Sequence, residues 1–343
     1  MKLERKTYRD GNLYPEVFNY LKFLPDNVLF HADHIQRHPF SLYCLSLQQI
    51  TQAFKAVLDE IDQASAALVD ANDCLNYRLD NLPKLQKELF HSLLCHIDIC
   101  YQILKALHPP VELKKSQKFA DRWLEQVKHP TYKKFQDAIK DYRESFAPIF
   151  NKVKHEGAPL RSVMVYSRNK GIIEYHPENG VKLFHRDARI VGYFLEDVQP
   201  DGCIGPDLDI HSGGNTAISL NRDLRRHFAN LYRVGEHLKS AIIKAVRELH
   251  KIKLPKPAPV EPNPYQDDLE QIAERISQLP TLFFEDEFSK TTPYIRYFRG
   301  THGGELIVEF PGFRNISWQG EAAIYVEAQV DSVSLEYRIL YMN

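Results

Sequence analysis

Residues 221–252 read NRDLRRHFANLYRVGEHLKSAIIKAVRELHKI, and they show the strongest helical pattern in the chain. Its apolar residues recur at the spacing of one face of an α-helix. That stripe consists of Leu224, Phe228, Leu231, Leu238, Ile242, Val246 and Leu249. The sequence therefore predicts a long amphipathic helix. Gly235 occupies one position of the stripe, which indicates that a neighbouring helix approaches closely there.

The chain before this helix has the same character. Four further helices are predicted, at residues 41–71, 83–108, 116–128 and 131–156. Pro109 and Pro110 end the second of them, because proline cannot continue a helix. In the fourth, Pro148 predicts a kink or a restart, and Gly157 predicts the end. Residues 1–40 show little periodicity and are predicted to form an irregular lead-in.

Between the fourth and fifth helices the hydrophobic period becomes that of strands. Short strands are predicted at residues 162–167, 171–176, 181–184 and 190–195, with turns at Gly171 and Gly180. Five prolines between residues 254 and 265 predict an extended linker. One helix and several strands with alternating polarity follow it.

The fold class predicted from these elements is α+β. Residues 41–253 form a mainly α-helical bundle with a small antiparallel β insertion at about residues 160–200. Residues 254–265 form the linker, and residues 266–343 form a small acidic α+β domain with antiparallel strands.

The composition is that of an ordinary globular protein, with 43% hydrophobic and 26% charged residues. The N-terminus is charged and has no apolar run behind it, so no signal peptide is expected, and no membrane-spanning segment is predicted. The five cysteines are odd in number and contain no CxxC pair, which argues against a disulfide framework or a zinc ribbon. Free thiols and a cytoplasmic location are the expectation.

Charge is distributed unevenly along the chain. Residues 222–256 contain ten Lys and Arg against three acids, whereas residues 261–343 contain six against fourteen. This pattern predicts a basic helix and an acidic C-terminal domain. Such regions could bind nucleic acid or a protein partner, or they could simply neutralise one another.

One short motif on the basic helix suggests a chemistry. An arginine and a histidine have four residues between them, with a polar residue directly after the arginine: Arg222, Asp223 and His227. This pattern resembles the motif of the HEPN superfamily, helical-bundle proteins of which many are metal-independent RNA endonucleases. The resemblance implies that Arg222 contacts the phosphate and the transition state, that His227 acts as general acid and base, and that Asp223 is the polar neighbour. It implies no cofactor, and an open cleft that a homodimer could complete.

Further polar residues could bind RNA around such a centre. On the basic helix these are Arg225 and Arg226. At the end of the fourth helix, Asn151 and His155 are four apart and share a face, with Lys152 beside them. The alternative for this second group is that its positive charges complement the C-terminal end of the helix dipole.

Two clusters were weighed as metal ligands. His31, His34 and His38 have helical spacing, and Asp207, Asp209 and His211 alternate as on a strand. Prolines and glycines next to both clusters favour loops and turns instead. No metal site is therefore predicted.

The sequence leaves two function classes open. It lacks GxxxxGK(S/T), GxGxxG, HExxH and GxSxG motifs, which lowers the expectation of an ATPase, a dehydrogenase, a zinc protease or an α/β-hydrolase. One hypothesis is a ribonuclease or another HEPN-like protein that acts on nucleic acid. The other is a non-catalytic interaction or scaffold protein that binds a protein partner through residues 266–343. The aromatic residues of that region are Tyr294, Tyr297, Phe298, Trp318 and Tyr325.

Overall fold

The structure is a computed structural model, and it describes most but not all of the chain. The described residues are 15–70, 81–113, 117–167, 189–198, 204–207, 209–210, 218–258 and 265–279, together with the strands at 294–300, 303–309, 323–330 and 333–340. The part with described side chains is mostly helical and includes a small antiparallel sheet. The predicted strands at 171–176 and 181–184 lie outside the described residues.

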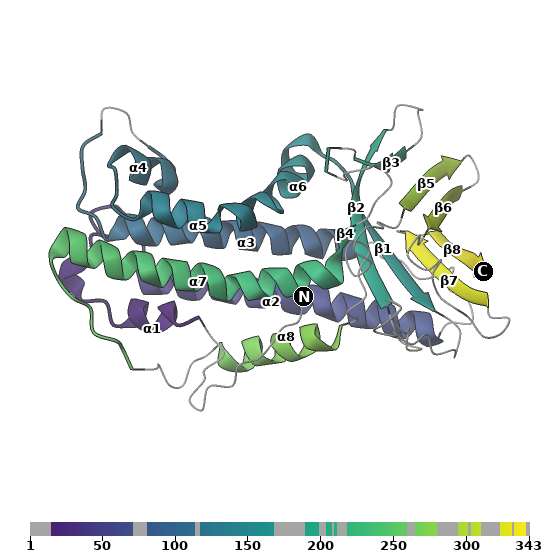
Figure 1. Ribbon diagram of the computed structural model, residues 1–343, viewed down its shortest axis with the longest axis horizontal. Helices are drawn as coiled ribbons and strands as arrows, with labels where there is room; N and C mark the ends of the chain where they lie inside the picture. The colour runs from purple at the N-terminus through teal and green to yellow at the C-terminus, as the bar shows by residue number, and fades with distance from the viewer. Residues whose placement is uncertain are drawn as a thin grey trace, which may run out of the picture.

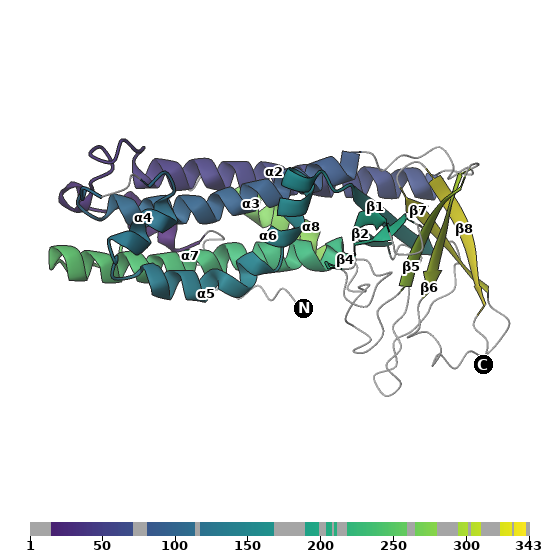
Figure 2. The same cartoon turned by 90° about the horizontal axis from the view of Figure 1, so that it is seen from above.

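Three long helices form the body of the bundle. They are α2 (Pro39–Asp70), α3 (Asn81–Ala106) and α7 (Leu220–His250), and they run side by side along the molecule (Figures 1 and 2). Shorter helices pack on them: α4 (Ala120–Gln126) and α5 (Tyr132–Glu144). The predicted helices therefore exist, and all but the fourth have ends within a few residues of the prediction.

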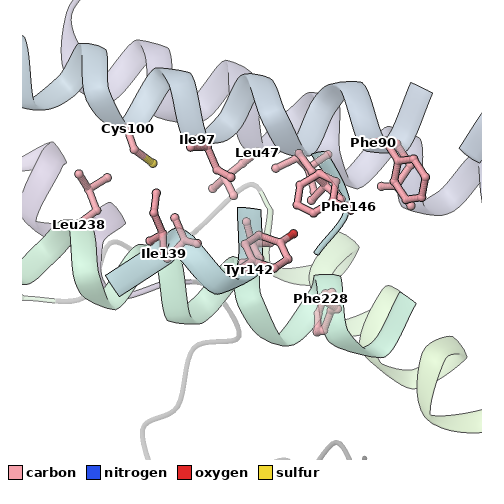
Figure 3. Close-up of a cluster of buried hydrophobic side chains, with 14 of the residues drawn as sticks. Leu47, Phe90, Ile97, Cys100, Ile139, Tyr142, Phe146, Phe228 and Leu238 are labelled. Atoms are coloured by element: carbon pink, nitrogen blue, oxygen red, sulfur yellow. The ribbon is translucent and has the colours of Figure 1, made fainter. Parts of the chain in front are cut away.

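Apolar side chains from several helices fill the interior of the bundle. Figure 3 shows Ile97 and Phe90 of α3 facing Phe228 and Leu238 of α7, with Tyr142 of α5 among them. These side chains are 0–7% exposed. Burial on this scale is the main stabilising contribution to such a fold. The stripe predicted for residues 221–252 is thus the face of α7 that packs into the core.

The lead-in was predicted to be irregular, and residues 23–38 contain only turns, coil and one 3-10 turn, but a short helix precedes them. Residues 17–22 form the short helix α1 (Val17–Lys22), and a 3-10 turn η1 (Asp26–Val28) follows. Val17, Phe18 and Leu21 are at most 1% exposed and belong to the core. Six residues are too few to show helical periodicity, so this packing has no signal in the sequence.

Gly235 explains how α1 reaches α7. A Cβ atom at Gly235 would lie 2.8 Å from Cβ of Pro15, 3.3 Å from the hydroxyl of Tyr43 and 3.4 Å from Val17. The close approach predicted from this glycine is therefore confirmed. The neighbour is the start of α1 together with Tyr43 of α2.

The predicted fourth helix is broken in the middle. After α5 ends at Glu144, the chain restarts as α6 (Ala147–Asn151), with Pro148 in its first turn, and continues as one π-helical turn, η3 (Lys152–Glu156). Pro148 has no N–H to donate to the preceding turn, so it suits the start of a helix rather than its interior. Gly157 ends the segment with φ +71°, as a left-handed C-terminal residue.

A sheet lies at one end of the bundle (Figure 1). Its first strands, β1 (Leu160–Ser167) and β2 (Arg189–Val198), pair in antiparallel register, with Ser162 opposite Tyr193. Two short strands, β3 (Ile204–Pro206) and β4 (Ile218–Ser219), pair with β2. β4 runs directly into α7, so it fixes the first turn of that helix against β2.

The C-terminal strands continue this sheet. β7 (Ala323–Val330) pairs with β1, and β8 (Val333–Leu340) pairs with β7, which gives the order β3-β2-β1-β7-β8. β5 (Tyr294–Gly300) and β6 (Gly303–Glu309) form a separate hairpin. The division of the chain into two domains at the proline linker remains a prediction.

Helix α8 (Gln266–Gln278) was predicted to belong to the C-terminal domain, but it packs on the bundle. Leu269, Ile272 and Ile276 are 0% exposed and are part of the bundle core. On its polar side, Arg275 pairs with Asp59 at 2.7 Å and with Asp62 at 2.8 Å, both on α2. The sequence showed the amphipathic stripe but could not show which surface it covers.

The composition also led to two predictions, free cysteine thiols and the absence of a membrane-spanning helix. Cys44, Cys95 and Cys100 are free thiols, while Cys74 and Cys203 lie outside the described residues. Within the part of the chain that the structure describes, no helix has both the length and the apolarity needed to cross a membrane.

Candidate functional site

The Arg222–His227 motif occupies the first two turns of α7. Ser219 caps the helix, because its hydroxyl accepts a hydrogen bond from the backbone N–H of Arg222 at 3.4 Å. Asp223 lies in the first turn, where its negative charge interacts favourably with the positive end of the helix dipole. The motif therefore begins at the junction between the sheet and the bundle.

Asp223 is buried, and its carboxylate accepts hydrogen bonds from two side chains. It is 6% exposed, and it accepts a hydrogen bond from the hydroxyl of Tyr193 at 2.5 Å and one from the guanidinium of Arg222 at 3.3 Å. Burial, and then the charge of Asp223, raise the pKa of Tyr193 well above its usual range, so this hydroxyl remains a donor. Asp223 thus connects α7 to Tyr193 of strand β2 and also binds Arg222 on its own helix.

His227 lies inside the bundle. It is 1% exposed, and the centroid of its ring is 5.0 Å from that of Phe146, 5.6 Å from Phe90 and 5.8 Å from Tyr142. Figure 3 shows Phe90, Tyr142 and Phe146 together between α3 and α7. Phe90 comes from α3, while Tyr142 lies in α5 and Phe146 just before α6. The expectation that His227 and Arg222 meet in an open cleft is therefore wrong for this single chain.

The surroundings of His227 also fix its charge state. Its Nδ1 is 3.1 Å from the hydroxyl of Tyr142, and among the described residues Nε2 has no hydrogen-bond partner. Burial lowers the pKa of His227 to about 4, and the charges of Arg226 and Arg222 act in the same direction, against Asp223. The ring is therefore neutral near pH 7. A general acid and base works best when its pKa lies near the operating pH.

The two other arginines of the motif differ in role. Arg225 is 2% exposed, and its guanidinium donates to the backbone carbonyls of Asn221, at 3.0 Å, and of Leu279. The guanidinium of Arg225 is therefore buried and joins α7 to the end of α8, whereas the predicted contact with nucleic acid needs an exposed group. Arg226 is half-buried, and its charge acts on the same Tyr142, Tyr193 and His227 side chains.

The second predicted group, at the end of α6, lies on the surface. Asn151 and His155 are exposed, whereas Lys152 is largely covered. The ammonium of Lys152 donates to Asp207 at 2.6 Å and to Asp209 at 3.1 Å. These bonds, led by the one to Asp207, raise the pKa of Lys152. Lys152 is therefore already neutralised by two carboxylates and is a poor phosphate ligand.

The same contacts account for one cluster weighed as metal ligands. Burial acts to raise the pKa of Asp207, but hydrogen bonds from Lys152 and from the backbone N–H groups of Ile210 and Asp209 outweigh it and lower the pKa. Asp207 and Asp209 thus bind a lysine, and His211 lies outside the described residues. In the described part of the chain, no group of three His, Cys, Asp or Glu residues could hold a metal ion.

The other cluster is a set of loop histidines, as the neighbouring proline indicated. His34 donates from Nε2 to the carbonyl of His108 at 2.8 Å and packs edge-on against Trp123 at 5.0 Å. The rings of His31 and His38 lie 5.0 Å apart. The contacts of His34 tie the loop before α2 to α4 and to the segment directly after α3.

The site contains two residues that the sequence analysis missed. Tyr142 and Tyr193 supply the hydroxyl groups that contact His227 and Asp223. Tyr142 was assigned to the apolar stripe of its helix, and Tyr193 to a strand, so both were treated as core. Their hydroxyls could have indicated a role in the site, because a buried tyrosine usually has a hydrogen-bond partner.

Comparison with known proteins adds no relative to this description. No protein-family model, no curated protein and no solved structure matches the chain.

Proposed function

We propose that this chain is a non-catalytic interaction protein, in which the Arg222–His227 motif stabilises the junction of bundle and sheet. The observation that carries the proposal is the environment of His227, which is 1% exposed, enclosed by three aromatic rings and neutral near pH 7. Acid–base catalysis on RNA requires a side chain within hydrogen-bond reach of the substrate. A substrate cannot reach His227 unless the bundle opens.

The rest of the motif supports the same conclusion. Arg222 and Tyr193 both bind Asp223, and Arg225 binds the backbone at the end of α8. Removing one partner from such a buried set leaves a polar or charged group unsatisfied, which destabilises the fold. The contribution of these residues to stability therefore accounts for their presence without a catalytic role.

The C-terminal strands are the proposed partner surface. β8 stands at the end of the strand order β3-β2-β1-β7-β8. A strand at the edge of a sheet offers unpaired N–H and C=O groups, to which an extended segment of another protein can add. The aromatic and acidic residues after the linker would then determine which partner binds.

The catalytic alternative is tested with two substitutions at one position. His227→Asn retains an amide that can bond to the Tyr142 hydroxyl but cannot transfer a proton, whereas His227→Ala removes both capacities. Purified wild type and both variants are incubated with single-stranded RNA in EDTA. The proposal predicts no cleavage above a protein-free control for any of the three. Cleavage by wild type that is lost in a folded His227→Asn variant would refute it.

The partner surface is tested by a truncation that respects the packing of α8. Because Leu269, Ile272 and Ile276 are in the core, the deletion begins after Leu279 and removes residues 280–343. Partners captured by the full chain are compared with those captured by the truncated chain, whose helix content is checked by circular dichroism. The proposal predicts that capture is lost while helix content is kept. Undiminished capture by the truncated chain removes the proposed role of the strands.

A further inference from the structure

The break between α5 and α6 creates a pocket on the outside of the bundle. The chain leaves α5 after Glu144, and Pro148 starts α6 in a new direction. A cavity of about 430 Å³ lies along these two helices and reaches Tyr101 of α3. This volume lies within the usual range for small-molecule sites. The three helices lie next to one another in Figure 2.

Tyr101 lines the pocket and is the one lining residue that comes from α3. Tyr101 is 2% exposed, and its ring packs edge-on against Phe135 at 5.4 Å and lies 6.0 Å from Tyr132. Burial raises the pKa of Tyr101 well above its usual range, so the hydroxyl stays protonated and can donate. This hydroxyl forms no hydrogen bond with any described residue, and Tyr101 is one of the residues that line the cavity.

Three cations line the pocket, and two of them have a partner. Lys133 pairs with Asp137 at 3.0 Å, and Lys140 pairs with Glu144 at 3.8 Å. Arg143 forms no ion pair and no side-chain hydrogen bond within the described part of the chain. Its positive charge nevertheless acts on the Tyr101 hydroxyl, opposing the rise of that pKa. The pocket thus holds one guanidinium whose donors are available.

We propose that this pocket binds the oxyanion group of a small ligand, a phosphate or a carboxylate. Arg143 would bind it through the paired donors of its guanidinium, which match the geometry of both groups. The Tyr101 hydroxyl and the side-chain amide of Asn151, which lines the same cavity and is exposed, supply further donors.

The charges around the pocket favour a small ligand over a nucleic-acid strand. Asp137 and Glu144 line the same cavity as the three cations. Along a polyanionic backbone these carboxylates would repel neighbouring phosphates, whereas a single oxyanion at Arg143 avoids them. The proposal is independent of the interaction surface suggested above, because it concerns a different face and different residues.

The test is isothermal titration with three probes: inorganic phosphate, adenosine monophosphate and succinate. The proteins are wild type, Arg143→Gln, Asn151→Ala and the control Lys134→Gln, which removes an exposed charge from α5 outside the pocket. All three substituted residues are exposed, so the variants should fold. Saturable binding of the phosphate probes identifies a phosphate site, and saturable binding of succinate a carboxylate site.

The proposal expects Arg143→Gln to weaken binding about tenfold, because hydrogen bonds to charged groups contribute on that scale. Asn151→Ala should weaken it about threefold, and Lys134→Gln should change it less than twofold. Absence of saturable binding for every probe overturns the proposal. An equal loss in Arg143→Gln and Lys134→Gln also overturns it, since that result indicates only a general effect of charge.

Discussion

Replacing His227 by alanine should destabilise the fold strongly. The substitution removes a ring in contact with Phe90, Tyr142 and Phe146, and it leaves the buried hydroxyl of Tyr142 without its partner. Truncation of a buried aromatic side chain to alanine costs about 3–5 kcal/mol. The orphaned hydroxyl adds roughly 1–3 kcal/mol, and removal of the unpartnered Nε2 offsets a similar amount. The last two effects roughly cancel, so a net loss of about 3–5 kcal/mol is expected.

The assay is urea unfolding followed by circular dichroism, with His227→Asn as the matched variant. Asparagine keeps a hydrogen-bonding group near Tyr142, so it should be at least about 1 kcal/mol less destabilising than alanine. In the Tyr142→Phe background, alanine should cost less than in wild type, because the hydroxyl that it orphans is already gone. A loss of less than about 0.5 kcal/mol for His227→Ala would place the ring at the surface and refute the reasoning.

Three further predictions test other parts of the structure. Stability should fall as pH decreases from about 6.5 to 4, because burial holds the pKa of three histidines at about 3 or 4 in the folded chain, whereas the unfolded chain protonates them near 6.5. These histidines are His96, His129 and His227. Urea midpoints that do not change between pH 7 and 5 would contradict this. Gly235→Ala should cost about 1–3 kcal/mol, since its Cβ would lie 2.8 Å from Cβ of Pro15; an unchanged thermal midpoint would show that α1 moves freely. Arg225→Gln should speed hydrogen exchange in α8, because the guanidinium bond to the carbonyl of Leu279 is lost; exchange equal to that of wild type would deny this role.

The helices of the bundle could be predicted because their signal is local. The stripe at residues 221–252 contains enough turns for the helical period to be clear, and Pro148 and Gly157 act on the backbone directly. Gly235 was informative for the same reason, since its missing side chain implies a neighbour. A strong prediction of this kind needs no knowledge of the rest of the chain.

The candidate site could not be predicted, because burial depends on residues distant in sequence. The periodicity placed His227 at the border of the apolar stripe, between Leu224 and Leu231. Whether a border position is open or closed depends on Phe90 and Phe146, which come from other parts of the chain.

The burial of Arg225 could not be predicted for the same reason. An arginine on a basic helix suggests a solvent-exposed charge, but two backbone carbonyls satisfy it inside the protein.

The most direct test of the central claim is an NMR titration of the His227 ring, assigned by comparison with His227→Asn, with and without single-stranded RNA. The structure predicts a pKa of about 4 that RNA does not change, because the ring is buried among aromatic side chains. A pKa near the ordinary value of about 6.5, shifting when RNA is added, would show an accessible catalytic histidine and contradict the account.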